Sequence, residues 1–400
     1  MNVIADMELS SLSLVQDRVG ILCGRGEASV TFDVHNNIDK ISLFKRLNVY
    51  CISTKRLTKY NMKKKVSMKD IALSLGVSTA LVSYVLNNKL QDKINNDTAE
   101  KIRQLAAALN YQPNHIAKSL KNKRTNTIGL IVADISNPFS ANLARIIENE
   151  AEKSNYSVIF GSADESYRKS QDLINVFLSR QVDGFIIAPA EGSEDQLLEL
   201  KERGIPFVLI DRCFPGLEVD QVTLNNFQAA YDAVSHLISN GYQRVGIVHL
   251  KTGLFHLQER VRGYEAAMTE HHIGGYHENL KLVEERAIKT EIKWKIDELL
   301  NKREPIEALF FTSNNLAIEG LAYLQKLGKK VPEDIAVVCF DQDHAYDLFH
   351  CPLTYIRQPL HEIGKASVEM LLRTIDERPG NTHIILDAAL IVHKSSLTIN

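Results

Sequence analysis

The residues best suited to read DNA bases lie in the sequence STALVSYVL, which begins at Ser78 and has apolar residues at helical spacing. A threonine or alanine methyl group contacts the methyl group of thymine, and a hydroxyl group donates one hydrogen bond to a base edge. Serine hydroxyls and lysines suit phosphate oxygens, which fix the register of a protein on DNA without carrying sequence information. The alternative for Tyr84 is a ring packed on its own domain. The candidate base contacts are Thr79, Ala80, Ser83 and Tyr84, and the candidate phosphate contacts are Ser67, Ser78, Ser83 and the neighbouring lysines.

Two short helices separated by a glycine must position these residues. Residues 67–70 have the S-x-x-D form of a capping box and predict a first helix over about 68–75. Gly76 suits the left-handed conformation that ends a helix, and Ser78 suits the cap of a second helix over about 79–87. Two short helices joined by a tight glycine turn form a helix-turn-helix, although an ordinary helical hairpin has the same pattern.

Charge is distributed unevenly along the chain, although the net charge is only −2. Residues 62–126 contain 12 Lys and Arg against 4 Asp and Glu, a net charge of +8, and residues 1–61 contribute +2. The remainder, residues 127–400, therefore carries −12. A basic segment that coincides with the predicted helix-turn-helix indicates a nucleic-acid-binding head on an acidic body, and a merely solvated face would not explain the coincidence.

A third helix, predicted over about 98–110, would close a three-helix core, and further motifs follow it. From about Met62 to the C-terminus the chain resembles the LacI family of bacterial transcription regulators. Any one of the matching motifs is weak, but all four occur in order at family-like spacing. They are D-I-A-x-x-x-G-V-S-x-x-x-V-S (Asp70 to Ser83), L-N-Y-x-P-N (Leu109 to Asn114), I-A-x-S-L-K (Ile116 to Lys121) and I-G-L-I-V-x-D-I-x-N-P-F (Ile128 to Phe139).

The resemblance also implies a hinge helix over residues 114–122, which is too short to be stable alone. In the family, two hinge helices pair on DNA in a dimer. Leu120 would then be a wedge in the minor groove that opens the central base step, supported by Ala117 and Lys121, and Asn114 is a further predicted DNA contact. The alternative is a plain linker. Many relatives carry arginine where this chain has Tyr84, so their operator preference does not transfer.

Beyond the hinge, short apolar runs alternate with helical segments, a pattern typical of parallel sheets covered on both faces. We expect an all-α helix-turn-helix head, joined by a hinge helix to an α/β domain of two doubly wound parallel-sheet subdomains. The resemblance places one subdomain near residues 126–241 plus 342–379 and the other between and after. The predicted strands are 127–134, 156–162, 184–190, 206–211, 244–250, 280–284, 308–312 and 335–341.

Ligands of doubly wound sheets bind beyond the carboxyl ends of the strands, where several polar residues of this chain are predicted to lie. Arg260 fits the family's R-x-x-G pattern, and its fork of donors suits two acceptors at once. Asn315 replaces the commoner aspartate of an S-N-D motif, which removes a charge that strict recognition of sugar hydroxyls would use. Loop capping or core packing is the alternative for each residue. The predicted effector-binding residues are Asn137, Phe139, Asn225, Arg260, Asn315 and Asp341.

Enzyme and metal chemistry find little support in the sequence. It contains no G-x-S-x-G, H-E-x-x-H, C-x-x-C or Walker motif, and its five cysteines lack metal-ligand spacing. We therefore expect no catalytic activity, no cofactor and no metal. Scattered cysteines indicate free thiols in a reducing cytoplasm. No run of about 18 apolar residues or secretory signal is evident, so no membrane span is expected.

Together these observations predict a cytoplasmic, homodimeric regulator, expected to be a repressor. It would bind a near-palindromic double-stranded operator and respond to a small-molecule effector, a sugar or a derivative. The alternatives are a sugar-binding module without DNA function and a regulator with a protein co-regulator. The predicted domains are a head over 62–112, a hinge over 113–125 and an effector-binding and dimerisation domain over 126–400. Residues 1–61 would be a disordered extension, or a start-site artefact if translation begins at Met62.

Overall fold

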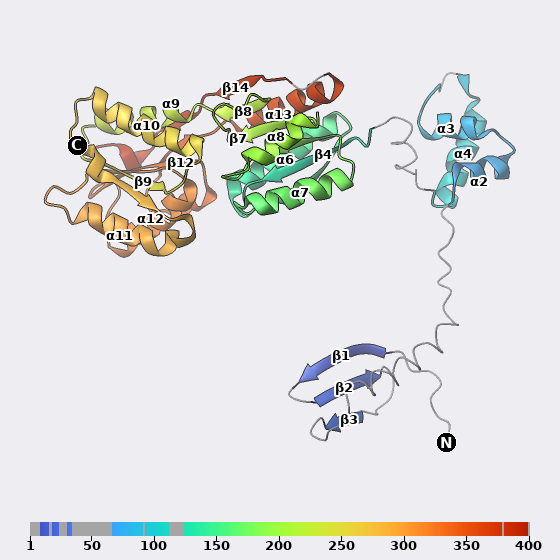
Figure 1. Ribbon diagram of the computed structural model, residues 1–400, viewed down its shortest axis with the longest axis horizontal. Coiled ribbons are helices and arrows are strands. Elements are labelled where there is room, and N and C mark those ends of the chain that lie inside the picture. Colours follow the sequence, from blue (N-terminus) through green and yellow to red (C-terminus); the bar gives the residue numbers. More distant parts are fainter. Residues whose placement is uncertain are drawn as a thin grey trace. The chain divides into compact units, whose positions relative to one another are not determined.

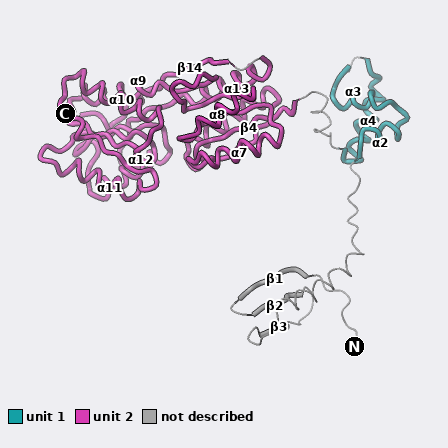
Figure 2. Tube along the Cα trace, viewed as in Figure 1, with its two compact units in different colours: residues 1–113 teal, residues 114–400 magenta. Residues whose placement is uncertain are grey.

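The protein consists of two compact units, residues 1–113 and residues 114–400 (Figure 2). In the first unit, three strands near the N-terminus form an antiparallel sheet in the order β1-β2-β3, which no periodicity in the sequence predicts. These strands are β1 (Leu9–Val15), β2 (Arg18–Cys23) and β3 (Val30–Asp33). The computed structural model describes residues 9–15, 18–23, 30–33, 66–90, 93–111, 124–377 and 380–398.

Three helices follow in the first unit, namely α2 (Met68–Leu75), α3 (Thr79–Leu86) and α4 (Asn96–Ala108). The Ser67 hydroxyl accepts the amide N–H of Asp70, and the Asp70 carboxylate accepts the amide N–H of Ser67 at 2.8 Å, which completes the predicted capping box. Gly76 ends α2 in the left-handed conformation, with φ of 64°. Ser78 caps α3 by accepting the amide N–H of Leu81 at 3.1 Å. The predicted helix-turn-helix is therefore present.

The two helices of this motif are bent by 113° about the turn. That angle lies in the range typical of helix-turn-helix motifs. Apolar side chains on the inner faces of α2, α3 and α4 form one core, in which Ile71, Val82 and Ile102 are fully buried. No single helix among the described residues has the length and apolar composition to cross a membrane; only α2 and α3 taken together, as this bent pair, do.

The second unit contains two six-stranded sheets, each the centre of one subdomain (Figure 1). The first sheet has the order β14-β8-β7-β6-β4-β5 and is parallel throughout. The second has the order β10-β9-β11-β12-β13-β15, in which only β15 is antiparallel to its neighbour. The first sheet comprises β4 (Thr127–Val132), β5 (Ser157–Ser162), β6 (Gly184–Ile187), β7 (Phe207–Asp211), β8 (Gln221–Leu224) and β14 (His383–Leu386). The second comprises β9 (Val245–Leu250), β10 (Leu280–Val283), β11 (Ala308–Phe311), β12 (Ala336–Phe340), β13 (Thr354–Arg357) and β15 (Ala389–Ile391).

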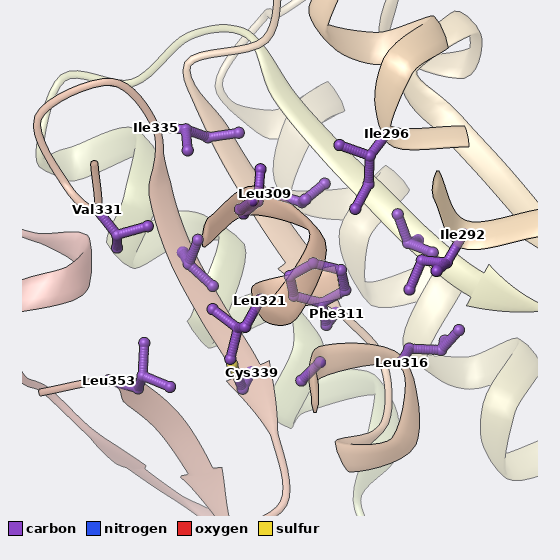
Figure 3. Packing of buried hydrophobic residues seen from close by; sticks show 14 of the residues in the cluster. Ile292, Ile296, Leu309, Phe311, Leu316, Leu321, Val331, Ile335, Cys339 and Leu353 are labelled. Atoms are coloured by element: carbon purple, nitrogen blue, oxygen red, sulfur yellow. The ribbon is translucent and has the colours of Figure 1, made fainter. Parts of the chain in front are cut away.

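Helices cover both faces of each sheet, which explains why the central strands are apolar on both sides. In the first subdomain, α6 and α13 share one core with the sheet, and α7 and α8 share the other. In the second subdomain, α9 and α10 cover one face, and α11 and α12 cover the other around Phe311 (Figure 3). The helices are α6 (Pro138–Lys153), α7 (Tyr167–Ser179), α8 (Glu194–Glu202), α9 (Asn226–Ser239), α10 (Phe255–Glu270), α11 (Ile288–Leu300), α12 (Asn314–Lys326) and α13 (Leu360–Asp376).

The points where the chain crosses between the subdomains differ from those expected. The first crossing follows β8 at Leu224, not residue 241, because α9 packs in the core of the second subdomain against α10 and β9. The second follows β13 at Arg357, not residue 342, because β13 pairs with β12. The third follows β14 at Leu386, not residue 379. Four-residue strands such as β8 and β14 give too weak a sequence signal to fix these boundaries.

The contact between α9 and α10 depends on Gly263. A Cβ atom at this position would lie 2.3 Å from the Phe227 carbonyl oxygen and 2.9 Å from the Ala230 Cβ. The glycine of the R-x-x-G pattern thus allows α10 to lie directly on the start of α9. That approach carries Arg260, one turn earlier on α10, to within hydrogen-bonding distance of Asn226.

Gly263→Ala is expected to destabilise the second unit by about 1–3 kcal/mol or more, because the added methyl group meets backbone atoms that cannot rotate away. Gly274→Ala is the matched control, since a Cβ atom there meets nothing within 4 Å. Denaturant unfolding of both variants measures the difference. Equal midpoints for the two variants would contradict the role given to Gly263.

Candidate functional site

The candidate DNA-reading surface is the outer face of α3. Thr79 and Ala80 are exposed at its first turn, and Ser83 is half-buried one turn later. Tyr84 is 41% exposed and does not belong to the core of the head. Val82 and Val85 occupy that core instead. One face of α3 therefore holds the helix in place and leaves the four predicted base-contact residues outside the core.

The two predicted serine contacts differ in whether the hydroxyl hydrogen already has an acceptor within the protein. The Ser67 hydroxyl donates its hydrogen to the Asp70 carboxylate at 2.7 Å, so it is occupied within the cap. The Ser78 hydroxyl accepts from Leu81, and its hydrogen has no acceptor among the described residues. Ser78 is therefore the better of the two hydrogen-bond donors to a phosphate. The predicted hinge residues Asn114, Ala117, Leu120 and Lys121 lie outside the described residues.

The candidate effector site is built around Arg260, whose guanidinium group is buried in the second subdomain. Its Nε donates to the Asn226 side-chain oxygen at 2.8 Å, and one terminal nitrogen donates to the Thr312 carbonyl at 2.6 Å. The guanidinium carbon lies 3.4 Å from the centre of the Phe340 ring, a stacked cation–π arrangement. Arg260 is only 3% exposed, and these contacts fix its orientation completely.

Two buried carboxylates, one from each subdomain, interact with Arg260. Asp211 ends β7 of the first subdomain, and Asp341 follows β12 of the second; both have a positive φ, of 65° and 68°. Burial raises the pKa of Asp211 to about 6, although Arg212 and Arg260 oppose the shift. Burial also raises the pKa of Asp341, against the attraction of Arg260 and a hydrogen bond from Gln358. These groups lie at carboxyl ends of strands, where ligands of doubly wound folds bind.

The same cluster contains buried hydrogen-bond acceptors without partners. The Thr312 hydroxyl has one hydrogen, so its contacts with the Val248 carbonyl at 3.2 Å and with His249 Nδ1 at 3.1 Å are both hydrogen bonds only when it donates to the carbonyl and accepts from a protonated Nδ1. His249 Nε2 is then an acceptor, and it is buried with no partner among the described residues. Burial and the nearby Arg260 lower the pKa of His249 to about 4, which keeps the ring neutral. The Gln358 side-chain oxygen is a second acceptor of this kind.

A cavity of about 360 Å³ lies where the two subdomains meet. On its first-subdomain side, Arg212 makes a bidentate ion pair with Glu165, with both N–O distances at 2.6 Å. The Arg212 Nε is buried and makes no hydrogen bond among the described residues, but it lies 3.5 Å from the Asp211 carboxylate, with which it forms an ion pair. The lining residues are Glu165, Glu191, Arg212, Leu250, Lys251, Thr252, Leu254, Leu257, Glu284, Glu285 and Arg286.

Outside the crossing segments, few side-chain hydrogen bonds among the described residues bridge the two subdomains, and these involve cleft residues. The side-chain amides of Asn137 and Asn314 donate to each other at 3.4 and 3.1 Å. Asn314 also donates to Asp343 at 3.1 Å. At the cavity, the Glu191 carboxylate accepts from the Thr252 hydroxyl at 2.8 Å and from the Gly253 amide at 3.0 Å. The angle between the subdomains is thus held by a small number of polar contacts.

The predicted effector residues have different surroundings. Arg260 and Asp341 belong to the buried cluster, and Asn137 lies at the bridge between subdomains. Phe139 is at the start of α6, against the core of the first subdomain. Asn225 caps α9 and donates to Asp387 at 3.0 Å, which ties two crossing segments together.

Asn315 lines a second cavity of about 360 Å³ that shares Glu285 and Arg286 with the first. Sequence reasoning places the segments that contain Arg212, Asn226 and Asn314 at the carboxyl ends of the strands without naming these residues as effector contacts. It misses His249, Gln358 and His256, whose buried Nδ1 has no hydrogen-bond partner among the described residues. Their common signal is that each follows a strand, ends a strand or begins a helix at the carboxyl edge of a sheet.

Comparison with known proteins assigns both units. Residues 125–394 match the family model of periplasmic binding proteins and the sugar-binding domain of the LacI family, and residues 67–114 match that of bacterial regulatory proteins of the lacI family. The chain belongs to the LacI family of bacterial regulatory proteins. It is a DNA-binding transcription regulator with a helix-turn-helix head and a periplasmic-binding-protein-like domain, as its motifs predict.

Relatives and solved structures agree with this assignment. The transcriptional regulator KdgR of Bacillus subtilis is 30% identical, over 84% of this chain and 100% of its own. The repressor CytR of Escherichia coli is 29% identical, over 82% of this chain and 96% of its own. The lac repressor dimer bound to operator and an anti-inducer shares the fold, with a TM-score of 0.73 at 22% identity, over 84% of this chain and 100% of that one. A LacI-family regulator from Enterococcus faecium with bound ribose has a TM-score of 0.60 at 29% identity, over 68% of this chain and 100% of that one.

The raised pKa of Asp211 makes a prediction about pH. Because its folded pKa of about 6 exceeds its ordinary value of 3.8, the folded state binds the proton more tightly than the unfolded state. The contribution of the Asp211 carboxyl to the free energy of unfolding is complete at low pH and is lost as the pH rises from about 4 to about 6. Asp211→Asn lacks this loss, so its melting temperature relative to wild type should increase over that range. The effect is at most about 3 kcal/mol, since one pKa unit corresponds to about 1.4 kcal/mol.

Melting temperatures at intervals from pH 4 to pH 7 measure this difference. Asp172→Asn, which removes a carboxylate from the exposed surface of α7, is the control. A constant difference between Asp211→Asn and wild type across the whole range would show that Asp211 is ionised throughout.

Proposed function

We propose that the protein is a cytoplasmic, homodimeric repressor whose affinity for its operator is controlled by a carbohydrate-type effector bound between the two subdomains. The observation that carries this proposal is the combination of the exposed face of α3 with a cleft in which several buried polar atoms make no hydrogen bond among the described residues. A protein that only bound sugars would not need the exposed face of α3. A DNA-binding protein without an effector would not need the polar cleft.

The chemistry of the cleft supports a ligand rich in hydroxyl groups. Hydroxyl groups both donate and accept, so one ligand can satisfy the acceptors His249 Nε2 and the Gln358 oxygen and the donor Arg212 Nε. Leaving such buried groups unpaired costs free energy, which a matching ligand recovers. Among structures of the same fold are regulators in complex with ribose and with cellobiose, which supports a saccharide as the effector class.

Effector control requires two arrangements of the subdomains with different affinities for the ligand. The bridges Asn137–Asn314 and Glu191–Thr252 are few and polar, so breaking or forming them changes the free energy by only a few kcal/mol. A ligand held by Arg260 and Asp341 on one side and Arg212 on the other would favour the closed arrangement. Closure would then alter the head spacing of a dimer and the folding of its hinge helices.

The domain boundaries form part of the same proposal. Residues 62–112 form the DNA-binding head, residues 113–125 the hinge, and residues 126–400 the effector-binding and dimerisation domain. In this scheme Leu120 enters the minor groove, with Asn114, Ala117 and Lys121 around it. A dimer binds two half-sites with matching two-fold symmetry, so the operator should be nearly palindromic.

The DNA-reading role is tested with Tyr84→Ala, measured on DNA from upstream of the protein's own gene. Loss of a base contact should weaken specific binding by about tenfold or more and leave non-specific binding unchanged. Lys69→Ala is the contrasting variant, because an exposed lysine at the start of α2 contacts phosphate and should weaken binding to all sequences alike.

Both variants should unfold at the wild-type temperature, since both side chains are exposed. Gel-shift titrations on the upstream DNA and on a scrambled duplex, at two salt concentrations, distinguish the two effects. If Tyr84→Ala weakened binding to both duplexes equally, Tyr84 would not take part in base recognition. The absence of specific binding by the wild-type protein would contradict the proposed function.

A further inference from the structure

Besides the two cavities, a groove of about 610 Å³ lies on the second subdomain beside strand β10 and helix α11. It shares Lys251 and Glu284 with the cavity between the subdomains. These two residues form an ion pair at 2.6 Å, and both side chains are more than half exposed. The remaining lining residues are Leu282, Thr290, Glu291, Trp294, Lys295 and Glu298. The groove is therefore a continuation of the effector cavity along the edge of the sheet.

Trp294, the single tryptophan of the chain, lies in this groove and is 74% exposed. On α11, Ile292 and Ile296 point into the core around Phe311 (Figure 3). Trp294 is two residues from each, which places it on the opposite side of the helix. Leu282, on the edge strand β10, is also exposed, at 42%. The indole ring thus makes no contribution to the core that would explain its presence.

The groove combines one aromatic side chain with side chains that donate and accept hydrogen bonds. Glu298 pairs with Lys295 of the groove at 3.6 Å and with Lys281, which does not line it, at 2.9 Å, and Glu291 accepts the backbone N–H of Glu284 at 2.9 Å. These pairs balance most of the charge, so the groove offers a polar rim without a strong field. A sugar ring has an apolar C–H face, which stacks on an indole ring, and a rim of hydroxyl groups, which suits paired lysines and carboxylates.

We propose that the effector is an oligosaccharide, with one unit in the cavity between the subdomains and a further unit stacked on Trp294. This inference rests on the proposed function, because it extends the same site. Continuity carries it: the ion pair between Lys251 and Glu284 lines both hollows, so a chain leaving the cavity passes directly over it. A monosaccharide in the cavity would leave the indole ring without a partner.

The test uses the full-length protein and paired probes of one and four sugar units: glucose with cellotetraose and maltotetraose, and xylose with xylotetraose. Because Trp294 is the only tryptophan, its fluorescence reports occupancy of the groove directly. At least one tetrasaccharide should change the emission saturably and bind at least tenfold more tightly than its monosaccharide. Monosaccharides should leave the emission unchanged.

Three variants test whether Trp294 is responsible for the higher affinity of the tetrasaccharide. Trp294→Ala should abolish the gain of the tetrasaccharide over the monosaccharide, measured by calorimetry, without changing the affinity for the monosaccharide. Trp294→Phe should retain most of the gain, because an aromatic face remains. Leu327→Ala, which removes another exposed apolar side chain of the second subdomain outside the groove, should behave as wild type.

The outcomes separate this inference from the function on which it rests. Suppose that a monosaccharide weakens operator binding. If its tetrasaccharide then binds no more tightly, or still binds more tightly in Trp294→Ala, the oligosaccharide site alone is overturned. If no saccharide of either length releases the operator, the proposal of a carbohydrate effector is overturned as well. An emission change caused only by self-association, recognised by its dependence on protein concentration, would assign the groove to a second copy of the chain and overturn the proposal.

Discussion

The buried guanidinium group of Arg260 is the constraint on which the cleft depends. Removing a cation from water costs several kcal/mol unless charge and hydrogen bonds compensate. Here the compensation comes from four separate segments: the start of α9, the end of β11, the end of β12 with Phe340 and Asp341, and the end of β7 with Asp211. Each lies at the carboxyl edge of a sheet, so the charge is satisfied only when both sheets are correctly formed. Gly263 contributes from one turn away by allowing α10 to approach α9.

The same constraint determines what a ligand must offer. Arg260 uses two of its five N–H donors on Asn226 and Thr312, and Asp341 already accepts from Gln358, so these groups present a rigid and partly filled surface. The unpaired atoms surrounding them are mainly neutral acceptors. A neutral ligand with several hydroxyl groups fits that arrangement, whereas an anionic ligand would meet Asp211, Asp341 and Glu165. Replacement of the commoner aspartate by Asn315 leaves that position without a charge.

The features that sequence predicted well are local. The cap at Ser67, the turn at Gly76 and the apolar faces of α2 and α3 follow from side chains within a few residues of one another. The alternation of strands and helices was also evident, because parallel strands are apolar on both faces. The crossings at Leu224 and Leu386 were misplaced, since short strands resemble loops until their partners are known.

The site itself was only partly predictable for a similar reason. Arg260 carries a motif, but His249 becomes a candidate only when Thr312, 63 residues away, assigns its proton. The bidentate pair of Arg212 with Glu165 spans 47 residues, and nothing in either local sequence indicates it. The sheet brings these residues together, and sequence patterns do not encode which loops meet at its edge.

The most direct test of effector control by the cleft measures operator affinity with and without a saccharide effector, in wild type and in Arg260→Lys. Lysine keeps the positive charge but cannot donate to Asn226 and Thr312 while stacking on Phe340. We predict a shift in operator affinity of about tenfold or more for wild type and almost none for the variant, with equal affinities in the absence of ligand. A variant that responds as strongly as wild type would show that the cleft around Arg260 is not where the effector acts.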